Sequence, residues 1–436
     1  MKPKHHDEHA HGALSPEMYH AAHRHEPLPF PKDFAWGAAT SAHQVEGGNT
    51  LNDWWAAEQA AHTSCMRRRK KNCDHIHVSG PAVDHWNRFR EDFDLAQQMN
   101  HNAHRLSLEW ARIEPEMGKF DPVALAHYRD VLASLRTRGM KTMVTLHHFS
   151  NPQWFVKRGG WGTRDASKLF ARYVEHVATE LGDLVDWWIT INEPLVYVTQ
   201  GWLAGVWPPF IHNAFIRALR VTWHLARAHR AAWRVLKIHT PGVPVGVAHN
   251  VLTIQVYRKH NFIDQMFAQW VDFLWNHSFL WLTRRATHDF IGINYYFHYR
   301  LARAHWRSLR FFIDVREEQR EASDIGWEVY PPGMADVLLD FTSYQLPIYI
   351  TENGIATEND DRRVRFLISC LKEVYHAIAA GAPVHGYFHW SLLDNFEWSF
   401  GFAKRFGLVE VHYDTMERHI RPSAYAYKKI CETNQL

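Results

Sequence analysis

Residues 184–194 read LVDWWITINEP, an apolar and β-prone run that ends in the polar pair Asn192 and Glu193. A second run, LPIYITENG at 346–354, has the same form and places Glu352 near its end. A carboxylate at the end of an otherwise buried strand is costly unless it is paired or used. Both runs therefore predict a buried strand whose last residues carry chemistry.

The same pattern recurs six more times along the chain, which makes eight strand-like runs. The other six are FAWGAAT (34–40), AHRLSLEW (103–110), KTMVTLHHF (141–149), VPVGVAHN (243–250), FIGINYY (290–296) and VHGYFHWSL (384–392). Segments with the 3.6-residue periodicity of helices lie between them, for example 81–99, 165–181, 213–233 and 363–381. Strands that are apolar on both faces, each followed by a helix-length connection, indicate parallel strands covered by helices. Eight such units with no linker between them predict the α/β class and a single (β/α)8 TIM barrel over residues 28–436.

Polar residues gather at the C-terminal ends of five of these runs. They are Arg105, Glu109, His147, His148, Asn192, Glu193, Asn294, Tyr296, Glu352 and Asn353. Catalytic groups of this kind of barrel collect at that edge, because the strand ends and the following loops face one funnel. The sequence therefore predicts that Glu193 and Glu352 lie across one pocket from each other.

Two carboxyl groups in one pocket suit the hydrolysis of glycosidic bonds. A separation of ~5–5.5 Å favours double displacement, in which one carboxylate attacks the sugar and the other group protonates the leaving oxygen. A separation of ~6.5–9.5 Å leaves room for water and favours inversion. The sequence leaves both outcomes open.

Composition limits the classes of partner. Hydrophobic residues make up 46% of the 436 residues and aromatic residues 14%, which supplies a large interior and argues against disorder. The formal charge is only +3, with 22% charged residues of both signs, so we expect neither nucleic acid nor a membrane as a partner. The N-terminus lacks the apolar core of a secretory signal, and prolines and polar residues interrupt the apolar stretch 195–216. The four cysteines, which are too few for a disulfide scaffold, are Cys65, Cys73, Cys370 and Cys431. We therefore expect a cytoplasmic protein.

Two segments have biased composition. Seven of the 33 histidines fall in the first 25 residues, at spacings that match no closed tetrahedral site. We expect residues 1–27 to be a disordered leader, and we expect no metal ion and no cofactor. The basic run MRRRKK at 66–71 is expected to be a solvated loop.

Seven motifs, in order, resemble those of glycoside hydrolase family 1, the β-glucosidase family of retaining (β/α)8 enzymes. The resemblance covers residues ~28 to 433 and rests on FAWGAATSAHQVEG, RLSLEWARIEP, TLHHFSNPQW, INEP, GINYY, ITENG and GYFHWSLLDNFEWSFGFAKRFGLV. It implies that Glu352 is the nucleophile and Glu193 the general acid/base, with Asn192 on the sugar 2-hydroxyl.

The resemblance also implies a set of substrate-binding and supporting residues. Trp390 would be the aromatic platform under the sugar ring and Phe406 a further wall. Arg105 and Tyr296 would donate to the nucleophile and keep it ionised, with Asn294 as a further supporting residue. The remaining sugar hydroxyls would be held by Gln44, His148, Glu397 and Trp398. His147 is expected to point to the opposite side of its strand from His148.

The chain departs from the family between its fifth and sixth strands. The stretch from Asn250 to Asn294 is shorter than the resemblance implies by about two dozen residues, and it lacks a Gly-x-Tyr-Pro stretch. The aromatic-rich segment 266–290 that remains is expected to form one covering helix. Either this side of the barrel is thinly covered and mobile, or a crevice opens there that admits a planar apolar ligand. The short loop at 356–363 is expected to leave the aglycone side open.

We therefore expect a retaining exo-β-glycosidase that acts on small β-D-glucosides, and on related β-D-fucosides and β-D-galactosides. Two alternatives stay open: a sugar-binding relic whose trimmed barrel has lost activity, and an enzyme that mainly transfers glycosyl groups to alcohols. The expected partner is a small-molecule β-glycoside, while the oligomeric state is left open. Glu397 predicts a preference for unphosphorylated glucosides, because a 6-phosphate would lie beside its carboxylate.

Overall fold

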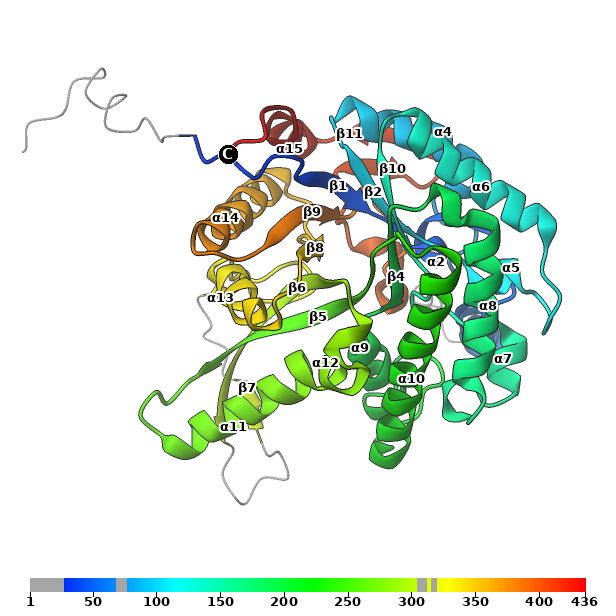
Figure 1. Ribbon diagram of the computed structural model, residues 1–436, viewed down its shortest axis with the longest axis horizontal. Coiled ribbons are helices and arrows are strands. Elements are labelled where there is room, and N and C mark those ends of the chain that lie inside the picture. The colour runs from blue at the N-terminus through cyan, green and yellow to red at the C-terminus, as the bar shows by residue number, and fades with distance from the viewer. Residues whose placement is uncertain (1–26, 68–76, 304–311, 315–319) are drawn as a thin grey trace, which may run out of the picture.

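The computed structural model describes residues 27–67, 77–303, 312–314 and 320–436, and it contains a closed barrel of eight parallel strands (Figure 1). Neighbouring strands in sequence pair with each other, β9 pairs with β1, and β5 pairs with β6, which closes the ring. The barrel strands are β1 (Ala35–Ala39), β2 (Ala103–Ser107), β3 (Lys141–Thr145), β4 (Trp187–Asn192), β5 (Val245–Val256), β6 (Phe290–Arg303), β8 (Ile348–Asn353) and β9 (Val384–Trp390). Each of the eight predicted runs contains one of these strands or its first part. The predicted fold class is confirmed.

Among the described residues, three short strands lie outside the barrel. β7 (Phe312–Asp314) pairs antiparallel with the end of β6. β10 (Val409–His412) and β11 (Glu417–Ile420) form a separate antiparallel hairpin.

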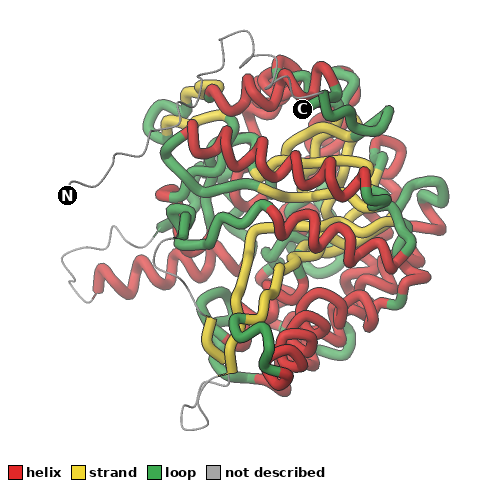
Figure 2. Tube along the Cα trace, turned by 90° about the vertical axis from the view of Figure 1, so that its left-hand side faces the viewer, coloured by secondary structure: helices red, strands yellow, loops and turns green. Residues whose placement is uncertain are grey.

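Helices surround the strands, as Figure 2 shows. The long ones are α3 (Asp53–Arg67), α4 (His85–Gln98), α6 (Pro122–Thr137), α8 (Ala166–Leu181), α10 (Phe215–His239), α11 (Phe262–Asp272), α13 (Pro332–Phe341), α14 (Asp360–Ala379) and α15 (Pro422–Thr433). The short ones are α2 (Ala42–Val45), α5 (Trp110–Ile113), α7 (Gln153–Lys157), α9 (Pro194–Val198) and α12 (Ser278–Thr283). Short 3₁₀- and π-helical elements are η1 (Gly160–Gly162), η2 (Gly182–Leu184), η3 (Thr199–Leu203), η4 (Phe273–His277), η5 (Arg285–Thr287), η6 (Thr342–Tyr344) and η7 (Trp398–Ala403).

Local sequence explains where several helices begin. Asp121 accepts hydrogen bonds from the backbone N–H groups of Val123 and Ala124, and Pro122 occupies the first helical position of α6. Asn359 caps α14 in the same way by accepting from the N–H of Arg362. None of the helices that the structure describes has both the length and the apolarity to span a bilayer.

The shortened segment between β5 and β6 differs from the expectation of one covering helix. It forms α11, η4 and α12 in succession, and Asn276 of η4 ties it to β5 by bonding the N–H and the C=O of Leu252 at 2.9 and 2.8 Å. The only α11 side chains that are buried are those of Asp264 and Ala268. Trp270 and Trp281 lie on the outer surface, more than half exposed, so these aromatic side chains do not line an interior crevice.

Two further expectations concern segments that the structure describes only in part or not at all. α3 continues through Met66 and Arg67, so the start of the basic run 66–71 is helical and the prediction of a loop was wrong there. Residues 68–71 and the leader 1–26 lie outside the described residues.

Candidate active site

Glu193 and Glu352 stand at the carboxyl ends of β4 and β8, and both side chains are buried. Each of these strands gains an extra residue against its neighbour just before the carboxylate, between Ile189 and Asn192 in β4 and at Thr351 in β8. β6 has a similar irregularity, in which Tyr296 is the unpaired residue. A bulge turns side chains out of strict alternation, so the irregularities in β4, β6 and β8 let the ends of these three strands aim polar groups into one space.

Glu352 is held by two donors. Arg105 of β2 donates through Nη1 to Oε1 at 2.5 Å, and the hydroxyl of Tyr296 donates to Oε2 at 2.9 Å. Burial raises the pKa of Glu352, while the positive charge of Arg105 and the Tyr296 hydroxyl oppose that rise. Of the two buried glutamates, Glu352 is therefore the one whose ionised form is stabilised.

Glu193 has neutral partners instead. The side-chain amides of Asn294 and Asn250 both donate to its Oε1, at 2.8 and 3.2 Å. Burial, and then the negative charge of Glu352, raise the pKa of Glu193 to about 8. Its backbone has φ of +41°, a left-handed conformation that an L residue with a side chain adopts at a cost. This strained turn at the start of α9 places the Glu193 carboxyl group close enough to Glu352 for the charge of Glu352 to raise its pKa.

A network of amides and one guanidinium connects the two carboxyl groups. Nη2 of Arg105 donates to Oδ1 of Asn192 at 2.6 Å, and Asn294 donates to the same oxygen at 3.2 Å. The amide nitrogen of Asn192 faces Nε2 of His148 at 3.2 Å. Burial and the charge of Arg105 hold the pKa of His148 well below its usual range, so Nε2 is a neutral acceptor there. Thr351 donates to Oδ1 of Asn294 at 2.6 Å, which fixes which way that amide faces.

Gln44 and Glu397 form the other end of the site. Nε2 of Gln44 donates to Oε2 of Glu397 at 3.2 Å and to the carbonyl of Phe396 at 2.9 Å. Burial, and then the charge of Glu352, raise the pKa of Glu397 to about 8. The ring of His148 stacks with the rings of Trp390 and Trp398, at centroid distances of 6.1 and 6.2 Å.

Phe406 completes the set of predicted residues that the structure brings together. Its ring centroid lies 6.3 Å from that of Tyr296. Tyr296 itself bonds Glu352, so Phe406 stands beside the carboxylate pair. Gly354 lets the turn after β8 approach the end of β9 closely, because a Cβ at this position would meet the carbonyl oxygen of Trp390 at 1.9 Å.

His147 turns away from this site, as strand alternation predicted. Its Nε2 bonds Asn151 at 3.0 Å, and its ring packs on Trp161 and Tyr197. Glu109, which the pattern also placed at the rim, accepts from Asn52 and from Ser150 instead of joining the pair.

Several residues of the site were missed from the sequence. Asn250 is the last residue of the fifth strand-like run, much as Asn192 lies near the end of the fourth, and that position was the available signal. An aromatic wall beside Trp398 was also missed: Trp54, Phe149 and Trp207, with ring centroids at 4.7, 5.3 and 5.8 Å from it. Trp54 belongs to the first turn of α3, whereas Phe149 and Trp207 lie in two separate loops, and no local pattern distinguishes the three from core residues.

One cluster of described side chains has ligand atoms close enough together to hold a metal ion, all within 4.8 Å of one another. It consists of Asp272, His277 and Asp340 on the outer helices, away from the two glutamates. Burial opposes protonation of His277, but hydrogen bonds to Asp272 and Asp340 raise its pKa to about 9. The cluster is therefore satisfied as an imidazolium between two carboxylates.

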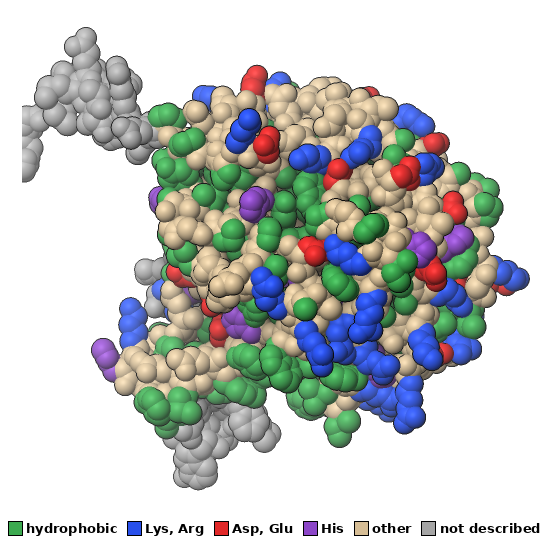
Figure 3. All heavy atoms as spheres, in the orientation of Figure 1, with side chains coloured by type: hydrophobic (Ala, Val, Ile, Leu, Met, Phe, Trp, Pro, Cys, Tyr) green, Lys and Arg blue, Asp and Glu red, His purple; other side chains and the backbone are tan. Residues whose placement is uncertain are grey.

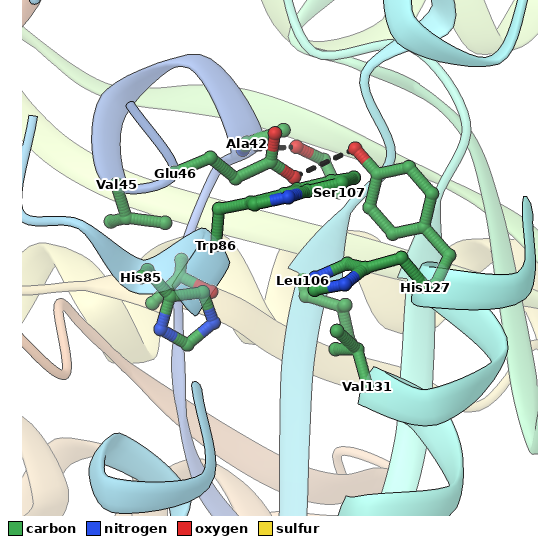
Figure 4. Close-up of a pocket in the computed structure, with 11 residues that line it drawn as sticks. Ala42, Val45, Glu46, His85, Trp86, Leu106, Ser107, His127 and Val131 are labelled. Atoms are coloured by element: carbon green, nitrogen blue, oxygen red, sulfur yellow. Dashed lines mark hydrogen bonds between the residues drawn. The ribbon is translucent and has the colours of Figure 1, made fainter. Parts of the chain in front are cut away.

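A small space apart from the two glutamates lies between α2, α4, β2 and α6 (Figure 4). Its volume is about 10 Å³, enough for a single water molecule. Within it, the hydroxyl of Tyr128 donates to Glu46 at 2.7 Å. Its size and its internal hydrogen bond indicate a structural role.

The chain is similar over most of its length to known glycosidases. The profile described as Glycosyl hydrolase family 1 matches residues 26–282 and 276–436. The 1,4-β-D-glucan glucohydrolase of Thermotoga neapolitana is 30% identical over 93% of this chain and 99% of its own length. The β-galactosidase of Pyrococcus woesei is 30% identical over 93% of this chain and 97% of its own.

A solved structure supports the same relationship. The β-glycosidase from Pyrococcus horikoshii has a TM-score of 0.86 and 39% sequence identity, with 94% of this chain and 96% of that chain covered. The chain therefore belongs to glycosyl hydrolase family 1 and is an O-glycosyl hydrolase of the β-glycosidase type.

Proposed function

We propose that this enzyme is a retaining exo-β-glycosidase that hydrolyses small β-D-glucosides by double displacement, with Glu352 as nucleophile and Glu193 as general acid/base. The observation that carries the assignment is the difference between the partners of the two carboxyl groups. Glu352 accepts hydrogen bonds from a guanidinium and a phenol. Glu193 accepts hydrogen bonds from two side-chain amides and has a pKa of about 8. An ionised nucleophile beside a protonated acid is the arrangement that the first step needs.

In the first step, Glu352 attacks the anomeric carbon while Glu193 transfers its proton to the glycosidic oxygen. The carbon–oxygen bond to the aglycone breaks, the alcohol leaves, and an ester forms between Glu352 and the sugar. The ester carries no charge, so the pKa of Glu193 falls once its negative neighbour has gone. Glu193 then accepts a proton from water, the water oxygen attacks the anomeric carbon, and Glu352 leaves as carboxylate with the β configuration restored.

The glycone is assigned to the polar end of the site. Asn192 is proposed to bind the 2-hydroxyl, where a hydrogen bond that strengthens in the transition state contributes most. Gln44, His148, Glu397 and Trp398 are proposed to bind the other hydroxyls. Trp390 is proposed to pack under the sugar ring and Phe406 beside it.

The range of glycones is proposed to include β-D-fucosides and β-D-galactosides besides β-D-glucosides. The relatives of this chain include a β-galactosidase as well as β-glucosidases, which supports this range. The aromatic wall of Trp54, Phe149 and Trp207 beside Trp398 is proposed to pack against the outer part of the substrate. An aromatic surface there also favours apolar alcohols as acceptors, which keeps glycosyl transfer as a second activity of the same site.

The deciding experiment is Glu352→Gly measured with a nitrophenyl β-glucoside. We expect turnover to fall by at least ~10⁴-fold with an unchanged melting temperature, and azide or formate to restore activity with an α-configured product. Glu358→Gly, an exposed glutamate on the following loop, serves as the matched control and should keep full activity. Turnover near that of the native enzyme in Glu352→Gly would overturn the assignment.

A further inference from the structure

Helix α10 carries an unusual outward-facing stripe. None of its 25 residues is acidic, while six are arginine or lysine. Residues spaced three or four apart share one side of a helix. On the outer side, the first half of the stripe exposes large apolar side chains next to Arg217 and Arg220, with Ile216 84% and Leu219 72% exposed and Trp223 half exposed. The second half continues the same stripe with Arg227, Arg230 and Arg234.

The arginines of this stripe surround a cavity of about 330 Å³ between α8 and α10. Lys168 of α8 lines it together with Arg227, Arg230 and Arg234. In the part of the chain that the structure describes, none of these three arginines forms an ion pair, so no carboxylate neutralises their charge. The guanidinium of Arg230 lies 5.5 Å from the ring centroid of Trp223, in a cation–π contact within the stripe. Burial, and then the charges of Arg284, Arg234 and Arg227, lower the pKa of Arg230. A cavity of this size and charge suits phosphate groups.

An apolar surface adjoins these cations. α12 packs against α10, and exposed hydrophobic side chains run along α11, η4 and α12. They are Phe262, Ile263, Met266, Trp270, Phe273, Leu274 and Trp281. Figure 3 shows the basic side chains gathered over α10 and the hydrophobic ones continuing toward α11 on the same face. Soluble monomers rarely expose so much contiguous apolar surface without a use for it.

We propose that the surface formed by α10, α11, η4 and α12 docks on an anionic phospholipid bilayer, with the lipid phosphates at the arginines of α10 and the apolar side chains in the interface. Trp, Phe, Ile and Leu beside Arg on one face is the composition of helices that lie in a membrane interface. The docking is peripheral, and it differs from the expectation that the overall charge of +3 suggested, because the cations are concentrated on one face.

Charge favours a bilayer over two other occupants. A second copy of the chain that presented the same face would bring its own unpaired arginines against these, which is repulsive. Nucleic acid would satisfy the arginines but leave the aliphatic side chains of Ile216, Leu219 and Met266 against phosphate and water. An anionic bilayer offers phosphate groups to the arginines and an apolar interior to the hydrophobic side chains, so both halves of the stripe find a partner.

The test is co-sedimentation of the full chain with vesicles of phosphatidylglycerol and phosphatidylcholine, compared with vesicles of phosphatidylcholine alone. We expect binding to the anionic vesicles only, and weaker binding as salt is raised, because surface charges are screened over about 10 Å at 0.1 M salt. The variant Arg227→Glu/Arg230→Glu/Arg234→Glu should lower the affinity at least ~100-fold, at about one factor of five per cation removed. Ile216→Ser/Leu219→Ser/Trp281→Ser should lower it at least ~10-fold.

Matched controls separate this face from charge or hydrophobicity in general. Arg365→Glu/Lys372→Glu/Lys429→Glu makes the same charge change on α14 and α15, across the molecule from α10 (Figure 1). Leu51→Ser/Val123→Ser/Tyr425→Ser makes a similar apolar change elsewhere. All four variants should hydrolyse a soluble aryl glucoside as the native enzyme does, which reports folding independently of lipid.

Three results would overturn the proposal. One is the absence of sedimentation with anionic vesicles while the enzyme is active. Another is sedimentation that the arginine reversal on α10 leaves unchanged. The third is a dimer, detected by light scattering, that either α10 variant dissociates. Should the α10 variants fail to fold, the native enzyme must still lose its vesicle binding between 0.05 and ~0.5 M salt, and persistence of binding would count against the proposal.

Discussion

Arg105 bridges the two halves of the site: one guanidinium nitrogen lies 2.5 Å from Oε1 of Glu352 and the other lies 2.6 Å from Oδ1 of Asn192. The two contacts join β2 to β8 and to β4 across the barrel mouth. Only a planar group with two donors pointing in fixed directions makes both contacts at once. The position of Asn192 and the charge of Glu352 are therefore set by the same side chain.

Arg105→Lys should lower kcat/KM for an aryl glucoside about 100-fold, because an ammonium group cannot reproduce both contacts. A weaker donor raises the pKa of Glu352, so the acidic limb of the pH–rate profile should move to higher pH. The profile of kcat/KM measures the shift. Arg129→Lys, which changes an exposed pair with Asp183, is the control. An unshifted acidic limb in Arg105→Lys would remove Arg105 from its assigned role.

Glu193→Ala should affect substrates according to their leaving group. An acid catalyst matters most when the departing alcohol is a poor leaving group. We expect hydrolysis of an alkyl glucoside to fall by at least ~10³-fold, while formation of the glycosyl-enzyme from a dinitrophenyl glucoside falls far less. Pre-steady-state release of dinitrophenol measures that first step. Equal losses on both substrates would exclude Glu193 as the acid.

The pH profile of the native enzyme should be bell-shaped, with an alkaline limb near pH 8 where Glu193 loses its proton. The hydrogen bond from Asn294 lowers the pKa of Glu193, so Asn294→Ala should raise that pKa. The alkaline limb should then move to higher pH, and the maximum rate should fall because Asn294 also contacts Asn192. Titration of kcat/KM between pH 4 and 10 tests this, and a limb that moves to lower pH would contradict it.

Glu397 should exclude phosphorylated sugars. A 6-phosphate beside this buried carboxyl group would bring a dianion into a poorly solvated pocket, next to a group that is at best neutral below its pKa of about 8 and negative above it. We expect kcat/KM for nitrophenyl glucoside to exceed that for its 6-phosphate at least ~100-fold, or roughly 2.7 kcal/mol. Lys404 does not offset this, because its ammonium group donates to the carbonyl of Asp324 at 2.6 Å.

Glu397→Ser tests which part of the sugar Glu397 faces. The variant should reduce the preference for the unphosphorylated substrate at least ~10-fold, chiefly by weakening turnover of the native substrate. Glu410→Ser, a partly exposed glutamate on β10, should leave the ratio unchanged. Equal kcat/KM values for the two substrates in the native enzyme would show that Glu397 does not face the 6-position.

Much of the architecture was predictable because short stretches of the sequence indicate it without reference to distant residues. Runs such as LVDWWITINEP and LPIYITENG are apolar on both faces and end in polar residues, which identifies a parallel strand and its functional end without any distant contact. For that reason Glu193 and Glu352 were found at the ends of β4 and β8, and His147 was correctly separated from His148.

Other features depend on tertiary structure, because they arise from contacts between segments far apart in the chain. The pairing of β5 with β6 and with β4 decides where Asn250 meets Glu193 and leaves Tyr296 unpaired to reach Glu352. Whether an aromatic residue is buried depends on what packs over it. Trp54 and Trp207 therefore pack on Trp398 in the site, whereas Trp270 and Trp281 lie exposed on the outer surface. The different pKa values of two chemically identical carboxyl groups likewise follow from Arg105 reaching one and amides reaching the other, and only the folded barrel brings those groups within hydrogen-bond distance.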